Sequence, residues 1–366
     1  MTEPIDDSAP STPLLSSSRP LARAYDVALL DLDGVCFAGE ARIPHAAEGA
    51  NGARALGMGL SFITNNASRA PQTVVDKLAA NGIEALAREV FTAAMDAAAL
   101  LRERLEPGAR VLVVGGDGVR RALTDEGFTV VDSADQDPAA VVQGWDPAVD
   151  WAMMSEGAYA IRAGAIHVAT NTDATLPTER GFALGNGSLV AAVANATGED
   201  YLAAGKPFPG IYRRALERAG GERPLAVGDR LNTDHVGARA ASIPGLHVLT
   251  GVSTARDVVL APPAERPAFL HTDLRGLLQP HPEPVRVVVD GDTWWQVGQE
   301  LARVEADHLV LARAPRPGAR QDLTGAAATL TLDAYRAAAS AAWAHADEAG
   351  QEALSVPELT VGPPGP

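Results

Sequence analysis

The sequence predicts an α/β fold: a core with a parallel sheet, an inserted α/β domain, and a small C-terminal module. The first observation is a pair of aspartate signatures about two hundred residues apart, Asp31 to Val35 (DLDGV) and Gly228 to Asp234 (GDRLNTD). Each follows an apolar run long enough only for a buried strand. The second observation is the alternation of short apolar runs with helical stretches from Tyr25 onwards, which is typical of parallel sheets.

The stretch after the first signature continues this alternation. Residues 60–63 read as a second buried strand that ends at Thr64. Pro71 then predicts a helix through about residue 81, with Gly82 as its stop. A further amphipathic helix is predicted from Thr92 to about residue 105, where a Pro-Gly pair ends it.

A new strand is predicted over 110–114, followed by the glycine-rich turn 115–118. The turn lacks the full spacing of a dinucleotide-binding loop, and no suitably placed acidic residue follows a second strand. A plain strand-to-helix turn is therefore the favoured interpretation. Both aspartate signatures need the same sheet edge, so the block between them is best explained as a domain inserted into another.

The predicted parts are, in chain order, a disordered leader (1–22), the first part of the core (23–105), the inserted α/β domain (106–200), the second part of the core (201–262), a linker rich in Pro and His (263–284), a C-terminal module (285–350) and a frayed tail (351–366). In the C-terminal module, residues 285–289 read as a strand, 333–349 as a helix, and the Trp294-Trp295 pair as packing between module and core.

Composition excludes several classes of protein. The formal net charge of −16 argues against nucleic acid or an anionic membrane as a partner, because both need a basic surface. A single cysteine, Cys36, excludes an internal disulfide and fits a reducing compartment. No secretory signal and no apolar run long enough to span a bilayer is found. The expected location is the cytoplasm, and Cys36 is expected to pack in the core.

The aspartate signatures predict magnesium-dependent phosphate chemistry. Carboxylates at the C-terminal ends of parallel strands lie where open α/β sheets hold ligands, and several of them repel each other unless a hard cation joins them. Asp31 can attack phosphorus and form an aspartyl-phosphate. Asp33 can protonate the leaving alkoxide and then activate water, and its carbonyl can ligate the metal. Asp229 is the natural side-chain ligand of Mg²⁺, with Asp234 nearby.

Two further motifs suit a phosphate group. Thr64, Asn65 and Asn66 offer a hydroxyl and amides at the start of a helical segment, a place that binds phosphate oxygens. Taken alone, this run is more often a helix N-cap. Lys206, between a glycine and a proline, can neutralise the nucleophile and the transferring group, although a lone lysine is usually a solvated surface charge.

Together these residues resemble the haloacid dehalogenase (HAD) superfamily of aspartate-nucleophile phosphatases. DLDG at 31–34, TNN at 64–66, GKP at 205–207 and GDRLNTD at 228–234 match its four motifs. Ile43-Pro44, Ser68-Arg69 and Gly251 to Ser253 add similarity to the subfamily of NagD, p-nitrophenyl phosphatases and phosphoglycolate phosphatases. The resemblance covers roughly residues 24–260 and implies a Rossmann-like core, an inserted α/β cap and a Mg²⁺ cofactor.

The resemblance also implies roles for these residues. Asp31 is the nucleophile, Asp33 the acid/base, Thr64 with Asn65 the phosphate binders, and Lys206 the charge stabiliser. The metal ligands are Asp31, Asp33 and Asp229, with Asp234 in the same acidic cluster. Two departures are present: Asn171 to Asp173 reads Asn-Thr-Asp where many relatives have Asn-Pro-Asp, and Asn232 stands where an acid is common.

The substrate loop is expected over residues 176–187 of the cap, where Glu179, Arg180 and Asn186 are candidate contacts to the leaving group. A structural return from cap to core is the alternative for any single residue there. A HAD phosphatase with a short extra module resembles actinobacterial glycerol-3-phosphate phosphatases, so glycerol 3-phosphate is the expected substrate. The expected partners are this small phosphorylated metabolite and a second copy bound through the cap.

Three alternatives stay open. The substrate could be phosphoglycolate, p-nitrophenyl phosphate or a nucleotide monophosphate. The enzyme could be a phosphotransferase or mutase of the same superfamily, although those usually carry a small helical cap near the first motif. The chain could also be a non-catalytic binding or regulatory protein on this fold, against which the intact Asp31 and Asp33 argue.

Overall fold

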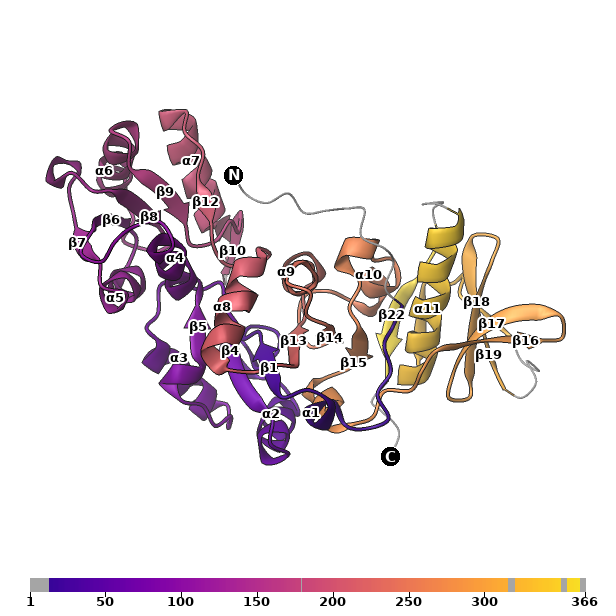
Figure 1. The fold of residues 1–366 in the computed structure, drawn as a ribbon. Helices are drawn as coiled ribbons and strands as arrows, with labels where there is room; N and C mark the ends of the chain where they lie inside the picture. Colours follow the sequence, from indigo (N-terminus) through magenta and orange to yellow (C-terminus); the bar gives the residue numbers. More distant parts are fainter. Residues whose placement is uncertain (1–12, 179, 315–319, 350–353, 363–366) are drawn as a thin grey trace. The chain divides into compact units, whose positions relative to one another are not determined.

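The computed structural model describes residues 13–178, 180–314, 320–349 and 354–362, which form two compact units (Figure 1). Described residues within 61–80 and 84–220 make up one, here called the inserted unit. Those within 5–60, 81–83 and 221–366 make up the other, here called the aspartate unit. The division differs from the expected one, in which the inserted domain began at residue 106, because the helices and the two strands between residues 61 and 105 group with the inserted unit.

A parallel sheet forms the centre of the aspartate unit, with neighbouring strands in the order β15, β14, β13, β1. Leu30 pairs with Val227, so β1 and β13 end side by side. The strands are almost wholly buried, as in sheets covered on both faces. Their bounds are β1 Val27–Leu30, β13 Pro224–Gly228, β14 Gly245–Val248 and β15 Phe269–His271.

Short elements complete this part of the aspartate unit. A hairpin of two short strands follows the first aspartate signature, and a helical turn begins within the second. These elements are α1 Leu21–Ala24, β2 Phe37–Ala38, β3 Ala41–Arg42, α2 Ala46–Ala55, a helical turn Leu231–His235, α9 Val236–Ala240, α10 Ala255–Val259, and turns at Pro263–Glu265 and Leu274–Leu278.

Two segments expected to be irregular are built into this unit. In place of a linker over 263–284, the structure has the buried strand β15, where His271 is fully buried. In place of a disordered leader to residue 22, Leu14 is buried and Ser17 pairs with His281 through backbone hydrogen bonds. The physical reason is tertiary: β15 pairs with β14, and Leu15 and Ser17 form backbone hydrogen bonds with Ala268 and His281, so backbone polar groups of both segments are satisfied. Residues 1–12 lie outside the described part.

The inserted unit contains a parallel strand pair, β4 (Gly59–Thr64) and β5 (Val90–Thr92), and a parallel sheet in the order β12, β9, β8, β6, β7. An antiparallel hairpin of β10 and β11 stands apart from that sheet. The remaining bounds are α3 Pro71–Ala80, a turn Ala87–Glu89, α4 Ala93–Arg102, β6 Arg110–Val114, α5 Asp117–Asp125, β7 Thr129–Val131, a turn Ala134–Gln136, β8 Ala140–Gln143, α6 Trp151–Arg162, β9 Ile166–Ala169, β10 Thr175–Thr178, β11 Gly181–Leu184, α7 Asn186–Thr197, β12 Leu202–Ala203 and α8 Pro209–Ala219.

The glycine-rich turn at 115–118 leads from β6 into α5, as the strand-to-helix interpretation expected. Packing explains its glycines. A Cβ at Gly116 would collide with the Asp146 carboxylate, and one at Gly118 would collide with the backbone of Ala67 and Ser68. These two positions of the turn therefore need glycine to fit against their protein neighbours.

The C-terminal module is an antiparallel sheet in the order β16, β17, β18, β19, β20, with helix α11 against one face. The expected frayed tail contributes instead a strand, β22, that pairs in parallel with β21 over residues 358–361. The bounds are β16 Val285–Val289, β17 Asp292–Val297, β18 Glu300–Glu305, β19 His308–Arg313, β20 Gln321–Asp322, β21 Ala327–Leu330, α11 Leu332–Ala349 and β22 Glu358–Val361.

The two tryptophans of the pair pack against different partners, because neighbouring residues of a strand face opposite sides of the sheet. Trp294 is fully buried on the face away from α11, with Leu301 and Val310, and the Arg303 guanidinium lies 4.8 Å from its ring centroid. Trp295 packs on the α11 face, against the cluster that α11 shares with α10. Only Trp295 fits the expected contact between module and core.

None of the helices in the described part of the chain combines the length and the apolar character needed to cross a lipid bilayer.

Candidate active site

The two aspartate signatures meet at one edge of the sheet in the aspartate unit. Asp31 follows β1 and Asp229 follows β13, its parallel neighbour. Carboxylate oxygens of Asp31, Asp229 and Asp234 all lie within 4.8 Å of one another. Asp229 and Asp234 are almost completely buried, at 1% and 2% exposure, and Asp31 is half-buried. The structure therefore brings together the three side-chain carboxylates expected in this acidic cluster.

This cluster fits a hard divalent cation. Three carboxylates at such distances repel one another, and burial of two of them removes the water that would screen that repulsion. Oxygen ligands of this kind are those that Mg²⁺ prefers. Two glycines leave room around Asp229, since a Cβ at Gly34 or at Gly251 would collide with its carboxylate. The donor set thus has the chemistry expected of a magnesium site.

Asp33 lies outside this three-carboxylate cluster. Its side chain is exposed, and Oδ1 accepts a hydrogen bond from the Gly39 N–H at 3.3 Å, at the hairpin of β2 and β3. An exposed carboxylate at this position can exchange protons with water or with a bound molecule. This position suits the expected acid/base role.

Cys36 is buried behind the signature, and its Sγ–H donates to the Asp31 carbonyl at 3.3 Å. Burial raises the pKa of the Cys36 thiol well above its usual value, and the charges of Asp31 and Asp33 raise it further. The thiol therefore stays protonated, and the expected packing role is confirmed.

A short segment, Thr250 to Ser253, supports Asp229 and the loops on either side of the carboxylate cluster. The Val252 N–H donates to Asp229 Oδ2 at 2.7 Å, and the Ser253 N–H donates to the Asp229 carbonyl at 3.0 Å. Ser253 Oγ accepts from the Leu231 N–H at 3.1 Å. Thr250 Oγ1 donates to the Gly34 carbonyl at 2.5 Å. In the sequence, Gly251 to Ser253 indicated only a resemblance to the subfamily. The hydrogen bonds that this segment makes to Asp229 were not predicted.

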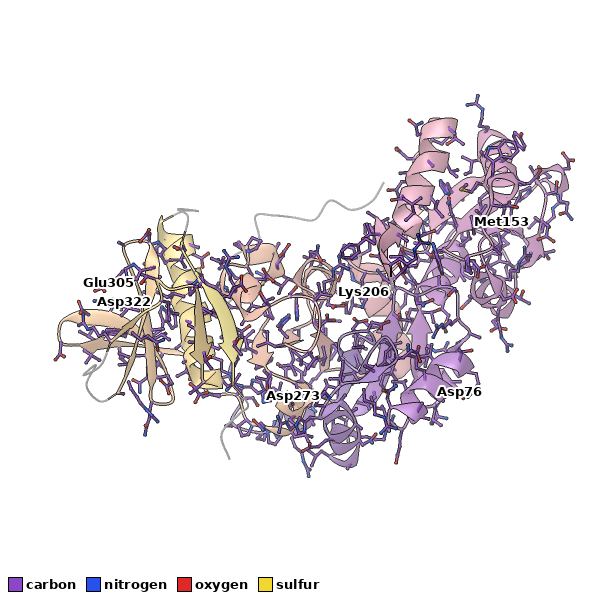
Figure 2. The ribbon with its side chains drawn as sticks, turned by 180° about the vertical axis from the view of Figure 1, so that it is seen from behind. Asp76, Met153, Lys206, Asp273, Glu305 and Asp322 are labelled. Atoms are coloured by element: carbon purple, nitrogen blue, oxygen red, sulfur yellow. The ribbon has the colours of Figure 1, made fainter. Side chains whose placement is uncertain are left out.

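The second set of predicted residues gathers in the inserted unit, at the end of β4. Asn65 Oδ1 accepts from the Lys206 N–H at 2.7 Å, and its Nδ2 donates to the Lys206 carbonyl at 3.0 Å and to Asp173 at 3.2 Å. The Asn65 amide is thus committed to holding the backbone of Lys206. Lys206 (labelled in Figure 2) is only 4% exposed, which excludes the solvated surface charge that a lone lysine usually is.

Asn65 is therefore better described as a positioning residue than as a phosphate-binding side chain. Thr64 is buried, and its Oγ1 accepts from the Asn66 N–H at 3.1 Å. Asn66 Oδ1 accepts from the backbone N–H of Ser68 at 2.9 Å, which is a local turn rather than the helix N-cap weighed as the alternative, because helix α3 begins only at Pro71.

Asp96 is a further buried support that sequence reasoning missed. Its Oδ2 accepts from the Gly205 N–H at 2.8 Å, and its Oδ1 pairs with Arg214 Nη1 at 2.7 Å. Burial raises the pKa of the Asp96 carboxyl, while Arg214 and the Gly205 N–H lower it. Gly205 has φ +76°, and a Cβ there would lie 2.8 Å from Asn65 Oδ1. The signal available in the sequence was an acid on the otherwise apolar face of α4.

The two predicted cap contacts behave differently. Arg180 is exposed at the tip of the β10–β11 hairpin, where it lines a shallow depression with Thr178 and Phe182. Asn186 is only 2% exposed, and its Nδ2 donates to the carbonyls of Gln143 and Asn171 at 3.2 and 2.8 Å. These hydrogen bonds join the start of α7 to the five-stranded parallel sheet of the inserted unit, so Asn186 is a structural residue. Glu179 lies outside the described residues.

The segment Asn171 to Asp173, which lacks the proline found in many relatives, is held in place by side-chain hydrogen bonds. Asn171 Nδ2 donates to the Asn65 carbonyl at 2.9 Å, and Asn171 Oδ1 accepts from the Asp173 N–H at 3.2 Å. Asn232, the other departure, accepts from Arg230 Nε at 3.1 Å. Neither departure disturbs the three-carboxylate cluster.

A second acidic group lies in the C-terminal module, where Glu305, His308 and Asp322 come together (Glu305 and Asp322 are labelled in Figure 2). Glu305 pairs with Arg303 and lies 3.9 Å from Arg320 Nη1. Because these guanidinium groups already offset the charge, this group has no need of a cation.

A family model described as haloacid dehalogenase-like hydrolase matches residues 28–129, and a HAD-hydrolase-like model matches residues 203–277. A D-glycerol 3-phosphate phosphatase of Mycobacterium tuberculosis is 40% identical over 337 residues, which cover 88% of this chain and 87% of the relative.

Two solved structures show how far the likeness extends. The glycerol phosphate phosphatase of M. tuberculosis in complex with magnesium superposes with a TM-score of 0.78 at 37% identity, covering 95% of this chain and 96% of that one. A p-nitrophenyl phosphatase variant of Geobacillus stearothermophilus gives a TM-score of 0.62 at 32% identity and covers 69% of this chain and 97% of that one. The second relative thus has no counterpart for nearly a third of this chain.

Proposed function

We propose, from the premise that this chain belongs to the haloacid dehalogenase-like hydrolases, that it hydrolyses glycerol 3-phosphate to glycerol and phosphate through an aspartyl-phosphate. The family, the parallel-sheet α/β fold and the class of phosphoric monoester hydrolase are as expected and are confirmed by the matches. The observation that carries the substrate is the 40% identity to a D-glycerol 3-phosphate phosphatase, which extends over 88% of this chain and so includes the cap and the C-terminal region.

The first chemical step is assigned to Asp31 and Asp33. An Asp31 carboxylate oxygen attacks phosphorus, a P–O bond forms, and the bond from phosphorus to the glycerol oxygen breaks. Asp33 gives its proton to that oxygen, so that glycerol leaves as an alcohol. In the second step Asp33 takes a proton from water, whose oxygen attacks phosphorus and releases Asp31 with inorganic phosphate.

Mg²⁺ is the cofactor of this proposal, held by Asp31, Asp229 and the carbonyl of Asp33, with Asp234 in the same cluster. When bound, it offsets the negative charge of carboxylates and phosphate. Lys206 supplies positive charge to the transferring group, and Asn65 fixes the Lys206 backbone for that purpose. Thr64 binds a phosphate oxygen through its hydroxyl hydrogen, which remains a donor while its Oγ1 accepts from the Asn66 N–H. Asn186 is not proposed as a substrate-binding residue, because its side chain is buried and its amide N–H groups already donate to the carbonyls of Gln143 and Asn171.

Substrate profiling tests the proposal. Release of inorganic phosphate is measured from glycerol 3-phosphate, phosphoglycolate, p-nitrophenyl phosphate and nucleotide monophosphates under one set of conditions. We expect kcat/KM to be highest for glycerol 3-phosphate among the physiological esters. A clear preference for phosphoglycolate or for a nucleotide would reject the substrate assignment and leave the phosphatase mechanism standing.

Metal removal is expected to abolish activity. Protein treated with chelator should release no phosphate, Mg²⁺ should restore turnover, and Ca²⁺ should be a poor substitute because it prefers more ligands at longer distances. The measurement is phosphate release against concentration of each added metal ion. Full turnover of metal-free protein would contradict the assignment of Asp229 as a metal ligand.

Arg180→Ala is expected to lower kcat/KM for glycerol 3-phosphate by about 2- to 10-fold, which is the effect expected from the loss of one directed hydrogen bond to the substrate. A polyol offers hydroxyl groups but little apolar area, so the loss for p-nitrophenyl phosphate should be smaller. The matched control is Arg121→Ala, an exposed arginine of α5 paired with Asp125, which should change neither value. Equal losses for the two substrates would make the hairpin a structural element only.

The proposal also covers partners and location. The hairpin of β10 and β11 exposes Phe182 and Leu184, at 82% and 65%, and we propose that a second copy of the chain binds through the cap. A monomeric molar mass by light scattering would contradict this. The single, buried Cys36 and the net charge of −16 support a cytoplasmic enzyme without nucleic-acid or membrane partners.

A further inference from the structure

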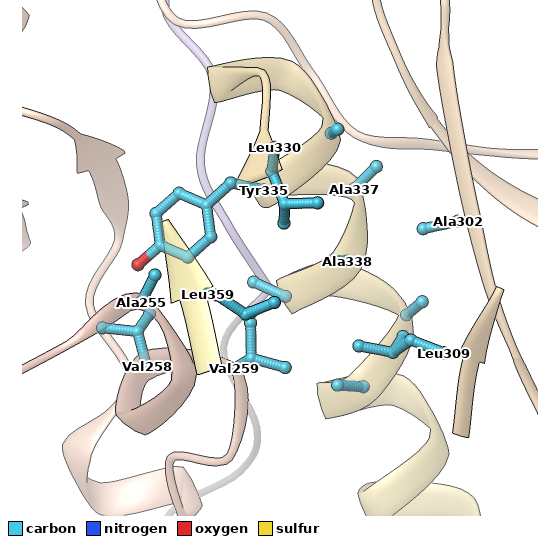
Figure 3. Close-up of a cluster of buried hydrophobic side chains, with 14 of the residues drawn as sticks. Ala255, Val258, Val259, Ala302, Leu309, Leu330, Tyr335, Ala337, Ala338 and Leu359 are labelled. Atoms are coloured by element: carbon cyan, nitrogen blue, oxygen red, sulfur yellow. The ribbon is translucent and has the colours of Figure 1, made fainter. Parts of the chain in front are cut away.

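The C-terminal module holds α10, the short helix that follows the Thr250 to Ser253 segment. Trp343 of α11 donates its indole N–H to the Val258 carbonyl at 2.9 Å, and both residues are buried. Arg256 Nε donates to the Val356 carbonyl at 2.7 Å. Figure 3 shows Ala255, Val258 and Val259 of α10 in one apolar cluster with Tyr335 and Ala338 of α11 and with Leu359 of β22.

Helix α10 depends on these contacts because of its length. It spans only five residues, Ala255–Val259, far below the length at which an isolated helix is stable in water. A second anchor follows it: Arg266, also buried, binds both oxygens of Asp347 in α11 at 2.8 and 2.9 Å. The position of α10 is thus set from the C-terminal module.

The start of α10 is joined rigidly to the segment before it. Thr254 caps the helix: its Oγ1 accepts from the Asp257 N–H at 3.2 Å, and Asp257 Oδ2 accepts from the Thr254 N–H at 2.8 Å. This reciprocal capping box leaves little freedom at the junction. A displacement of α10 therefore moves the residues immediately before Thr254.

Those residues are the ones bonded to Asp229. Val252 and Ser253 donate consecutive N–H groups to the carboxylate and to the carbonyl of that one residue, at 2.7 and 3.0 Å. The side chain of Leu231, two residues beyond Asp229, lies in the same apolar cluster as α10 and α11. Two routes, one by hydrogen bonds and one by packing, thus run from α11 to the loop that carries Asp229 and Asp234.

We propose that the C-terminal module positions the metal-site carboxylate Asp229, through α10 and the Thr250 to Ser253 segment, and that Trp343 is its positioning residue. The inference rests on the proposed function in one respect, the assignment of Asp229 as a metal ligand. Trp343 touches neither metal nor substrate, so its removal acts on metal affinity through the position of Asp229.

The test compares two conservative variants of the full-length protein. Trp343→Phe keeps an aromatic ring and removes the N–H donor to Val258. Trp294→Phe is the matched control: it alters an equally buried tryptophan of the same module, on the sheet face away from α11. Three quantities are measured: the dissociation constant of Mg²⁺ by calorimetry, amide hydrogen exchange at Val252 and Ser253 in metal-free protein, and Tm.

We expect Trp343→Phe to raise the Mg²⁺ dissociation constant roughly 3- to 10-fold, as the loss of one buried hydrogen bond implies, and to speed exchange at the two amides. Trp294→Phe should lower Tm while leaving the dissociation constant and the exchange rates unchanged. A Trp343→Phe protein with unchanged Mg²⁺ affinity, or equal changes in both variants, would overturn the proposal.

A second variant keeps the test decisive if Trp343→Phe does not fold. Arg256→Met removes the donor to Val356 and keeps the aliphatic stem, and the same three measurements apply to it with the same expected direction. Failure of the proposed function is recognised separately, because it would appear as wild-type protein that binds Mg²⁺ but hydrolyses no phosphate monoester. Exchange at Val252 and Ser253 in metal-free protein is independent of that outcome.

Discussion

Asp31→Asn is expected to lower kcat by at least ~10³-fold while the protein stays folded. An amide is too weak a nucleophile to attack phosphorus at a useful rate, so the aspartyl-phosphate does not form. The measurement is steady-state release of phosphate from glycerol 3-phosphate, together with Tm and a trapping experiment for the phosphorylated enzyme.

The fold should survive for an electrostatic reason. Asp31 is one of three carboxylates within 4.8 Å, so its neutralisation in metal-free protein removes repulsion from Asp229 and Asp234. We therefore expect Tm without metal to be unchanged or higher. The control is Asp76→Asn, an exposed carboxylate of α3 (labelled in Figure 2), which should retain full activity. Substantial turnover by well-folded Asp31→Asn protein would reject Asp31 as the nucleophile.

The part of the site predicted best is the part that follows from local patterns. A buried run followed by aspartates and glycine places the carboxylates at strand ends, and the parallel pairing of β1 with β13 then brings Asp31 to Asp229. Both signatures lie within a few residues of their strands, so sequence periodicity was sufficient. The glycine at position 34, whose Cβ would collide with Asp229, follows from the same crowding.

What sequence could not predict depends on contacts between distant residues. The Asn65 amide binds the backbone of Lys206, 141 positions away, and Asp96 binds the N–H of Gly205, 109 positions away. No local pattern shows that an asparagine will hold a lysine rather than a phosphate. Only the tertiary structure assigns Asn65 to positioning.

The expected linker shows a related limit. Proline and histidine are frequent there, and composition of that kind is typical of irregular surface segments. In the structure His281 is buried, its Nδ1 accepts from Arg336 of α11 at 3.3 Å, and its Nε2 donates to the Gly276 carbonyl at 2.9 Å. Burial lowers the pKa of His281 to about 3, with help from the Arg336 charge, so the ring is neutral and behaves as a polar core residue. Composition cannot show such pairing because the partner lies in another module.

Asp33→Asn is expected to produce a defect that depends on the leaving group. Glycerol leaves poorly as an alkoxide, so without a proton donor the first phosphoryl transfer from glycerol 3-phosphate should slow on the order of 10²- to 10⁴-fold. p-Nitrophenolate leaves without protonation, so the same step with p-nitrophenyl phosphate should lose much less. The amide oxygen introduced by Asp33→Asn can still accept the hydrogen bond that the Gly39 N–H donates, which should preserve the hairpin of β2 and β3.

Rapid mixing separates this step from the hydrolysis that follows. The Asp33→Asn protein should release a burst of p-nitrophenolate close to one equivalent and then turn over slowly, because the water that attacks the aspartyl-phosphate has lost its base. With glycerol 3-phosphate no burst of glycerol should appear. The comparison is internal, since one protein sample with one metal content meets both substrates. Equal losses in the first transfer for the two esters would mean that Asp33 donates no proton to the leaving group, and its assignment as the general acid would be rejected.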